Sequence, residues 1–241
     1  MVGGRDRYLV IEGIDGIGKG VALEGIGEAA LERGLRVFDL HDEWKRGVHP
    51  GLDVISANSY DVLITAEPRY IGIGADVRWH LHNGLSSAAR MAHLFSEDRY
   101  EHLVSAVHPA LDAGRIVVQS RTFLSTLVYQ LRQARIEDSD LSIDTILSHA
   151  GSELARSRPP RHVLIGSVPD VSVLEERFAS AHRERPDAYE NLAFQASISP
   201  RYEDSELLEP LSDSRISYFD AAVSIDHTKR SASDAFLALL D

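Results

Sequence analysis

The stretch GIDGIGK, residues 13–19, matches the pattern G-x-x-x-x-G-K. It follows a short apolar run, Tyr8–Glu12 (YLVIE), and precedes the segment Lys19–Arg33, whose apolar residues recur at helical spacing. A strand, a glycine-rich loop and a helix in this order let backbone N–H groups surround phosphate oxygens. The stretch therefore predicts a phosphate-binding loop at the start of a βαβ unit.

The loop would bind the phosphates of ATP through Gly13, Ile14, Asp15, Gly16, Ile17, Gly18, Lys19, Gly20 and Val21. Lys19 would reach the β- and γ-phosphates. A glycine-rich turn without a ligand is the alternative interpretation. Gly20 departs from the pattern, because a Ser or Thr at this position normally binds Mg²⁺ through its hydroxyl. The site either holds the ion through water, or it has lost catalysis and only binds nucleotide.

Short apolar runs alternate with helical patterns along the rest of the chain. The runs predicted as strands are Tyr8–Glu12, Leu35–Leu40, Asp61–Ala66, Arg115–Gln119 and His162–Ile165, with a last strand within Ile216–Ile225. The segments predicted as helices are Lys19–Arg33, Ile73–His82, Ala88–Ala113, Ser125–Gln133, Asp144–Ser157, Val171–His182, Asn191–Leu208 and Ala232–Leu240. The stretch His41–Tyr60 predicts a loop with a short helix. We expect one domain, residues 1–241, with a three-layer α/β/α fold around a mainly parallel five-stranded sheet.

The composition argues against several classes of protein. The chain of 241 residues has a net charge of -12, so it lacks the basic face of a protein that binds polymeric nucleic acid. It contains no cysteine, which excludes disulfides and thiolate metal sites, and its 11 histidines show no spacing typical of a transition-metal site. No stretch has the apolar length that spans a membrane. We expect a cytoplasmic protein without membrane partners.

Four further segments resemble the thymidylate kinase family, in the family's order. Residues 65–78 (TAEPRYIGIGADVR) are similar to T-x-E-P-x-x-x-x-x-G-x-x-x-R, and residues 94–102 (LFSEDRYEH) to L-F-x-A-x-R-x-x-H. Residues 114–130 (GRIVVQSRTFLSTLVYQ) are similar to G-x-I-V-x-x-D-R-Y-x-x-S-S-x-A-Y-Q, and DAYEN at 187–191 with Arg201-Tyr202 to D-x-F-E-x and R-Y. The resemblance implies a P-loop nucleoside monophosphate kinase that uses ATP and Mg²⁺ to phosphorylate dTMP. It also implies a homodimer packed through helices such as Ala88–Ala113.

The resemblance implies an acceptor site formed by Asp15, Glu67, Pro68, Arg78, Phe95, Arg99, Arg121, Ser125 and Gln130. Asp15 would contact the 3′-hydroxyl of the sugar, and helix capping is its structural alternative. Arg78 and Arg121 would bind the acceptor phosphate, because a planar guanidinium can grip it with two hydrogen bonds. A solvated helix face is the alternative for Arg78.

The same resemblance implies how the base is read. Phe95 would stack on the base and Arg99 would hydrogen-bond to it, with Ser125 and Gln130 as further lining residues. Gln130 would best distinguish one pyrimidine from another. For Phe95, Ser125 and Gln130 a packed helix position is the alternative.

The catalytic residues implied by the resemblance are Lys19, Arg121, Arg183 and Arg185. The last two lie in a charged segment, about residues 180–192, that matches the family's mobile lid and would otherwise be a solvated loop. Ser120 stands where the family has an Asp that helps to hold Mg²⁺. The two positions that usually contribute to the metal site, called here the metal-side positions, are therefore both changed, to Gly20 and Ser120, and no metal ligand is assigned. Glu67 or Asp98 could compensate through water.

Three functions remain open from the sequence. The first is a dTMP kinase. The second is a kinase for another pyrimidine or a modified deoxynucleotide, which the long insertion at about residues 41–60 makes plausible. The third is a nucleotide-binding protein without useful turnover, which Gly20 and Ser120 would explain.

Overall fold

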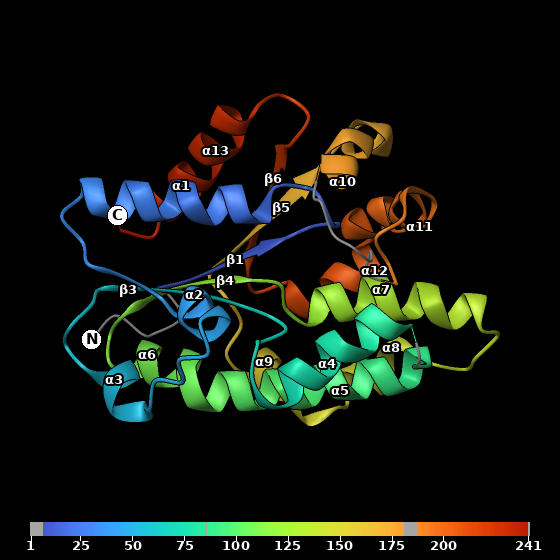
Figure 1. The fold of residues 1–241 in the computed structure, drawn as a ribbon, viewed down its shortest axis with the longest axis horizontal. Coiled ribbons are helices and arrows are strands. Elements are labelled where there is room, and N and C mark those ends of the chain that lie inside the picture. Colours follow the sequence, from blue (N-terminus) through green and yellow to red (C-terminus); the bar gives the residue numbers. More distant parts are fainter. Residues whose placement is uncertain (1–6, 85, 181–187, 241) are drawn as a thin grey trace.

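A parallel sheet of six strands forms the centre of the molecule (Figure 1). The computed structural model describes residues 7–84, 86–180 and 188–240. The strands are β1 (Tyr8–Glu12), β2 (Val37–Asp39), β3 (Val62–Ala66), β4 (Ile116–Ser120), β5 (His162–Ser167) and β6 (Arg215–Asp220). Their order in the sheet is β2-β3-β4-β1-β5-β6, and each neighbouring pair runs parallel. The expected α/β fold with a mainly parallel sheet is confirmed, whereas the expected number of five strands is wrong.

The sixth strand, β6, is an edge strand with a weak sequence signal. It pairs with the outer edge of β5, and Val163 lies opposite Ile216. Only Phe219 among its six residues is buried, so the segment lacks the continuous apolar pattern of the interior strands. β6 ends at Asp220, and Ile225 begins a helix instead of ending the strand.

Helices cover both faces of the sheet and give the expected three layers (Figure 1). One face carries α1 (Lys19–Glu32) and α13 (Ile225–Leu237). The remaining helices are α2 (Leu40–Lys45), α3 (Leu52–Ser56), α4 (Gly72–Asn83), α5 (Ala88–His102), α6 (His108–Asp112), α7 (Phe123–Ile136), α8 (Ile143–Leu147), α9 (Ala150–Ser157), α10 (Glu175–Ser180), α11 (Leu192–Ile198) and α12 (Ser205–Leu208). Gly25 lets α1 approach α13, because a Cβ there would lie 2.8 Å from Cα of Lys229.

Several predicted helices are interrupted. The run Ala88–Ala113 contains a π-helical segment, Leu103–Val107, between α5 and α6. Pro109 follows this segment, and its missing N–H removes one hydrogen bond of a regular α-helix. The segment His41–Tyr60, predicted as a loop with one short helix, contains α3 and all of α2 except Leu40. In the described part of the chain, no helix is both long and apolar enough to cross a membrane.

The phosphate loop connects the central strand to α1. Because all strands are parallel, the ends of β1, β3 and β4 at Glu12, Ala66 and Ser120 meet at the same edge of the sheet. The side chains just beyond these ends form the candidate site.

Candidate active site

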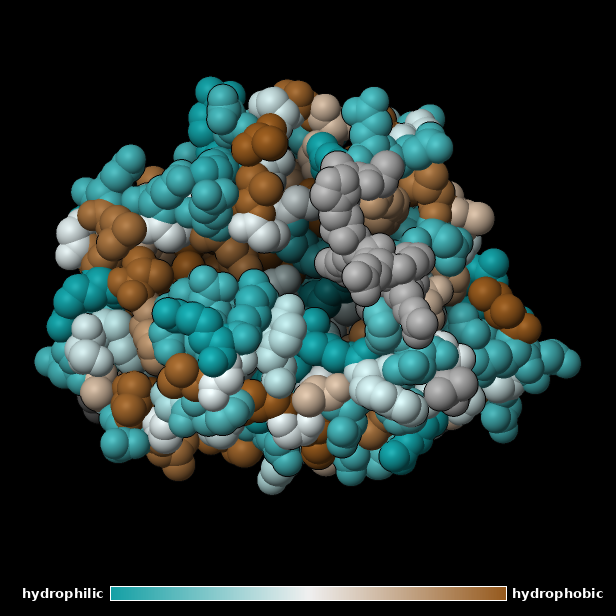
Figure 2. All heavy atoms as spheres, in the orientation of Figure 1, coloured by the Kyte–Doolittle hydropathy of each residue, from teal (hydrophilic) through white to brown (hydrophobic). Residues whose placement is uncertain are grey.

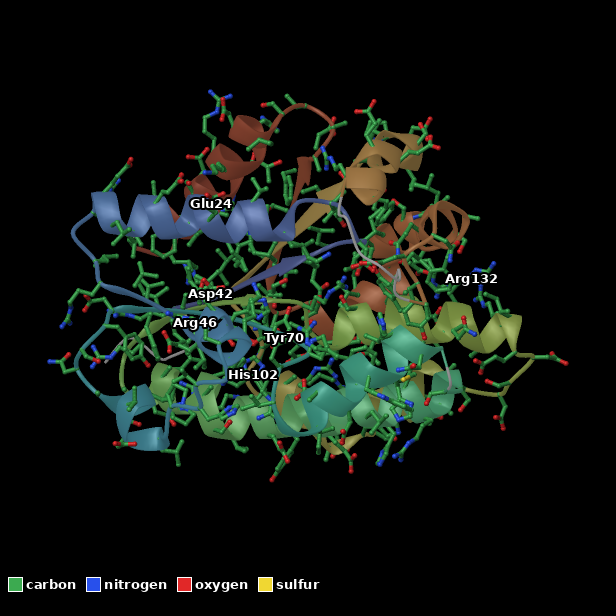
Figure 3. The ribbon with its side chains drawn as sticks, in the orientation of Figure 1. Glu24, Asp42, Arg46, Tyr70, His102 and Arg132 are labelled. Carbon is green, nitrogen blue, oxygen red and sulfur yellow. The ribbon has the colours of Figure 1, made fainter. Side chains whose placement is uncertain are left out.

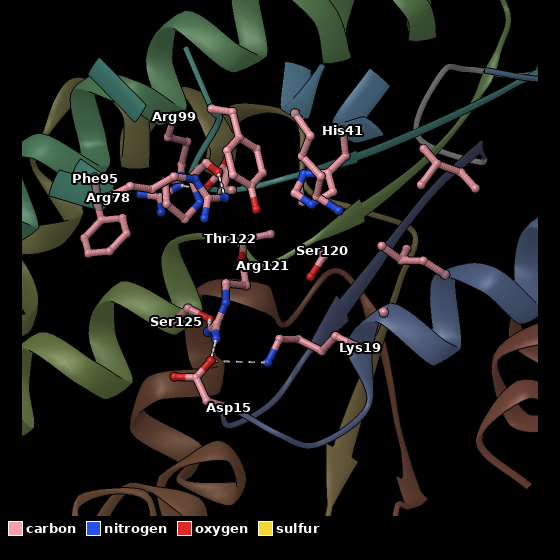
Figure 4. Close-up of a pocket in the computed structure, with 18 of the residues that line it drawn as sticks. Asp15, Lys19, His41, Arg78, Phe95, Arg99, Ser120, Arg121, Thr122 and Ser125 are labelled. Atoms are coloured by element: carbon pink, nitrogen blue, oxygen red, sulfur yellow. Dashed lines mark hydrogen bonds and ion pairs between the residues drawn. The ribbon is translucent and has the colours of Figure 1, made fainter. Parts of the chain in front are cut away.

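A cavity of about 640 Å³ opens at the carboxyl ends of the strands, between α1, α2, α4, α5 and α7 (Figure 4). Figure 2 shows the surface hollowed at this place. The predicted site residues that line the cavity are Asp15, Lys19, Gly20, Glu67, Pro68, Arg78, Phe95, Arg99, Arg121, Ser125 and Gln130. The predicted lid residues Arg183 and Arg185 lie outside the described residues.

The phosphate loop is shaped by glycines and anchored by two isoleucines. Positive φ angles, which favour glycine, occur at Gly13, Gly16 and Gly18. Ile14 and Ile17 are buried in the core, and Asp15 between them lines the cavity. The Nζ of Lys19 donates hydrogen bonds to the carbonyl oxygens of Gly13 (2.9 Å) and Ile14 (2.7 Å).

Lys19 is electrostatically unusual. Burial lowers its pKa to about 7, and the neighbouring charge of Arg121 acts in the same direction. The carboxylate of Asp15 lies 4.0 Å from Nζ and partly offsets this effect. An anion bound in the loop would favour the charged ammonium, so Lys19 suits a phosphate ligand.

Asp15 is held by partners from three other parts of the chain. Its carboxylate pairs with the guanidinium of Arg121 and accepts hydrogen bonds from the hydroxyl of Tyr129 (3.0 Å) and the amide of Gln195 (3.2 Å). Burial alone would raise the pKa of Asp15, but the charges of Arg121 and Lys19 outweigh it and lower the pKa. The N-cap residue of α1 is Gly18, not Asp15, and no described side chain caps this helix, so the capping alternative for Asp15 is wrong.

Arg121 lies at the centre of the cavity in a constrained backbone conformation. Its φ of 70° is in the left-handed region, which costs energy for a residue other than glycine. Its N–H donates to the carbonyl of Ile11 (2.9 Å), and Nη1 donates to Oγ of Ser125 (3.0 Å). The guanidinium also lies 5.2 Å from the centre of the Tyr129 ring. These contacts fix the guanidinium between the loop and α7.

Glu12 is a buried carboxylate that the sequence reasoning missed. It accepts hydrogen bonds from the N–H of Thr122 (2.6 Å) and from the hydroxyl of Ser125 (2.6 Å), and burial raises its pKa. Through these contacts Glu12 ties β1 to the turn that carries Arg121. The sequence feature that could have identified Glu12 is a charged residue at the end of an otherwise apolar strand, directly before the loop. Ser125 therefore supports Arg121 and Glu12 in addition to lining the cavity.

Glu67 belongs to a buried polar network. Its carboxylate accepts hydrogen bonds from Nε of Arg99 (2.9 Å) and Nε2 of Gln119 (2.9 Å), and Nδ1 of His102 lies 3.3 Å away. Burial would raise its pKa, but Arg99 and His102 outweigh this effect and lower it. Asp98 is likewise engaged, with Nε of Arg69 at 2.7 Å. Both carboxylates are therefore engaged by neighbouring side chains, and compensation for the missing metal ligands through water stays a prediction.

Two buried donors that line the cavity have no hydrogen-bond partner among the described residues. One is Nη1 of Arg99, whose other nitrogens bind Glu67 and Thr126 (2.9 Å). The other is Nε2 of Gln130, whose Oε1 accepts from the hydroxyl of Tyr189 (3.2 Å). Unpaired donors in a buried site cost free energy, and both donors are available to hydrogen-bond to acceptor atoms of a ligand.

Arg78 and Phe95 complete the far side of the cavity (Figure 4). Arg78 donates to the backbone oxygens of Arg69 (3.1 Å) and Pro68, and its guanidinium stacks on the ring of Tyr70. The solvated-face alternative for Arg78 is therefore wrong. Phe95 is partly buried against a small apolar cluster and also lines the cavity.

The metal-side positions offer few ligands. Nothing lies within 4 Å of the position that a Cβ of Gly20 would occupy, and Ser120 provides a single hydroxyl in the cavity. Across residues 7–84, 86–180 and 188–240, no group of three His, Asp or Glu side chains could hold a metal ion. The described side chains thus do not fit a protein-held Mg²⁺ site.

The sequence is similar to known thymidylate kinases. A family model described as thymidylate kinase matches residues 52–231. The probable thymidylate kinases of Thermococcus onnurineus and Thermococcus gammatolerans are 30% and 29% identical over 132 residues, which is 51% of this chain and 52% and 51% of theirs. The thymidylate kinase of Helicobacter acinonychis is 30% identical over 123 residues, covering 51% of this chain and 49% of its own length. The chain thus spans about half the length of the curated relatives it matches.

Proposed function

Because the chain belongs to the thymidylate kinase family, we propose that it transfers the γ-phosphoryl group of ATP to a nucleoside monophosphate, with dTMP as the acceptor. One observation carries the proposal. A single cavity contains the loop lysine, Lys19, two arginines suited to phosphate, Arg78 and Arg121, and two buried donors without partners.

The two buried donors suit the base of dTMP. Thymine presents two ring carbonyl oxygens as acceptors, which Nη1 of Arg99 and Nε2 of Gln130 could bind. Cytosine presents an amino group in place of one carbonyl. This hydrogen-bond donor would face a second donor, the nitrogen of Arg99 or Gln130, and no hydrogen bond would form. Uracil has the same two carbonyls, so these two contacts favour thymine or uracil over cytosine without separating the first two.

The two cavity carboxylates that pair with arginines, Asp15 and Glu67, favour a phosphate acceptor over a hydroxyl acceptor. A hydroxyl would need a general base with a pKa near the working pH. Asp15 and Glu67 both have lowered pKa values and are engaged with arginines, so both are weak bases. The oxygen of an acceptor phosphate is already ionised and needs no base.

Transfer then depends on position and charge. A phosphate oxygen of the acceptor forms a bond to the γ-phosphorus of ATP as the bond to the β,γ-bridging oxygen breaks, and ADP leaves with that electron pair. Lys19 would bind the donor phosphates, and Arg78 and Arg121 the acceptor phosphate. Arg121 would also neutralise charge on the transferring group. Mg²⁺, if required, would be held by the nucleotide phosphates and water.

The other expectations from the sequence remain predictions. They are a single domain over residues 1–241, a lid at about 180–192 with Arg183 and Arg185 as its catalytic residues, and a homodimer. Tyr100 and Val104 are exposed and one turn apart, and they would form part of the dimer interface.

A panel assay tests the proposed function. Purified protein is incubated with ATP, Mg²⁺ and dTMP, dUMP, dCMP or dGMP, and diphosphate formation is measured. We expect turnover with dTMP, little with dCMP, and loss of turnover in Lys19→Ala, which also controls for contaminating kinases. Turnover with another monophosphate and not with dTMP would mean that the protein is a kinase for that other nucleotide. ATP binding without turnover on any acceptor would contradict catalysis and support the nucleotide-binding alternative, which Gly20 and Ser120 favour.

The lowered pKa of Lys19 predicts proton uptake on ATP binding. At pH 8 the free protein holds Lys19 mostly uncharged, because its pKa is about 7. Bound phosphates raise the pKa, so binding should take up as much as about one proton at pH 8. Calorimetric titrations in buffers of different ionisation enthalpy measure this number. Lys19→Arg is the matched control and should take up none, since a guanidinium stays charged. Equal proton exchange in both proteins would contradict the prediction.

A further inference from the structure

The short helix α2 forms a wall of the cavity that the predicted site residues do not include. Leu40 and Trp44 are buried and anchor the helix, and the Trp44 ring packs edge-on against His102 with ring centres 5.5 Å apart. His41 and Lys45 are four residues apart, so they lie on one face, and both line the cavity. The core thus fixes α2 while this face lines the cavity.

An aromatic ring links this face to the proposed phosphate site. The guanidinium of Arg78 lies 3.6 Å from the centre of the Tyr70 ring. The ring centre of His41 is 5.1 Å and the Nζ of Lys45 is 5.9 Å from the same ring. Figure 3 shows Tyr70 beside α2. His41 and Lys45 are therefore held next to the arginine that would bind the acceptor phosphate.

The imidazole of His41 lacks a partner at one nitrogen. Its Nδ1 is buried, and no described residue hydrogen-bonds to it. Burial lowers the pKa of His41 to about 4, and the charges of Lys45 and Arg78 add to this effect. The ring is neutral at pH 7 and experiences net positive charge from its neighbours. In Figure 4 it lies across the cavity from Lys19, with Ser120 between them. A neutral imidazole in a positive environment can donate one hydrogen bond to an anion.

We infer that His41 and Lys45 form an additional phosphate-binding subsite on α2, which binds the phosphate of the acceptor together with Arg78. The inference rests on the proposed function, since it concerns the same acceptor. In the free protein Lys45 lies 3.4 Å from the carboxylate of Asp42, which also lines the cavity. Asp42 therefore competes with the phosphate for Lys45. The subsite makes the insertion at about 41–60 part of the recognition of a phosphorylated acceptor.

The test compares dTMP with thymidine, which lacks the phosphate. Dissociation constants are measured by calorimetry for wild type, Lys45→Ala and Arg46→Ala. Lys45→Ala should weaken dTMP binding about tenfold, as expected for one hydrogen bond to a charged group, and leave thymidine binding unchanged. Arg46, the C-cap residue of α2, is the matched control, because it pairs with Glu43 and does not line the cavity. Its replacement should change neither constant.

Two further variants sharpen the test. Asp42→Asn should tighten dTMP binding about threefold, since it releases Lys45 from a surface ion pair. His41→Ala should weaken dTMP binding and spare thymidine. An equal loss for dTMP and thymidine in Lys45→Ala, or unchanged dTMP binding, would overturn the subsite while leaving the proposed function intact.

A separate arm distinguishes failure of the proposed function. If wild type binds no nucleoside monophosphate, the proposed acceptor is wrong, and protection against thermal unfolding by inorganic phosphate is measured instead. Protection by phosphate that is seen in wild type and in Arg46→Ala, but is lost in Lys45→Ala, would support the anion subsite. Equal protection of all three proteins, or none, would overturn it.

Discussion

Arg121→Ala is expected to lower the turnover number with dTMP about 10³-fold, the lower end of what an arginine contributes to phosphoryl transfer. The guanidinium is fixed by Asp15 and Ser125, and its backbone is held in the left-handed region by a hydrogen bond to Ile11. It is therefore positioned before the substrates bind, which is the arrangement that stabilises developing charge most strongly. Water entering after truncation could not replace it.

Steady-state kinetics and ATP titration check this prediction. The turnover number should fall while ATP still binds, because Lys19 and the loop remain. Arg121→Lys should recover only part of the rate, since an ammonium cannot grip a phosphate bidentately. Arg132→Ala is the matched control on α7, the helix that follows Arg121, because Arg132 hydrogen-bonds to Ser197 and lies away from the cavity (Figure 3). A tenfold or smaller effect of Arg121→Ala would contradict the role proposed for this residue.

Glu67→Ala should lower the free energy of unfolding by about 3–5 kcal/mol, the cost of removing one partner from a buried ion pair. The side chain of Glu67 is only 3% exposed, and its loss leaves Arg99 charged and buried without its carboxylate. Gln119 and His102 would lose an acceptor as well. The large effect therefore follows from buried groups that lose their hydrogen-bond and ion-pair partner.

Urea denaturation measures the change in stability. Asp112→Ala provides the control, because Asp112 also pairs with an arginine, Arg158, but its side chain is 70% exposed. A surface pair of this kind contributes about 1 kcal/mol or less. Similar losses for Glu67→Ala and Asp112→Ala would mean that the buried network does not stabilise the fold as argued.

The phosphate loop and the overall architecture could be predicted from the sequence because their signals are local. Residues 13–19 lie next to each other between an apolar strand and a helix, so one short window contains the whole pattern. The parallel sheet followed from the alternation of strands and helices. The edge strand β6 was harder to count, because partial burial removes the apolar pattern that marks interior strands.

The partners of the site residues could not be predicted, because they come from distant segments. Gln195 from α11 holds Asp15 in the loop, and the sequence has no feature that pairs these two positions. The sequence suggested Glu67 as a substitute near the metal, whereas Arg99 and its neighbours occupy its carboxylate. The wall formed by α2 was also missed, because His41 and Lys45 match no family segment.

The position of β1 at the centre of the sheet has a consequence for how the chain folds during synthesis. Tyr8 pairs with Val117 of β4, and Leu9 with His162 of β5, so β1 is synthesised before both of its partner strands and must wait for them. Its helix waits longer still, since Gly25 packs against Lys229. Contacts this distant in sequence close large loops and slow folding. The nascent chain would expose the apolar strand YLVIE until β4 and β5 have left the ribosome, and a chaperone that shields this segment would raise the yield of folded protein.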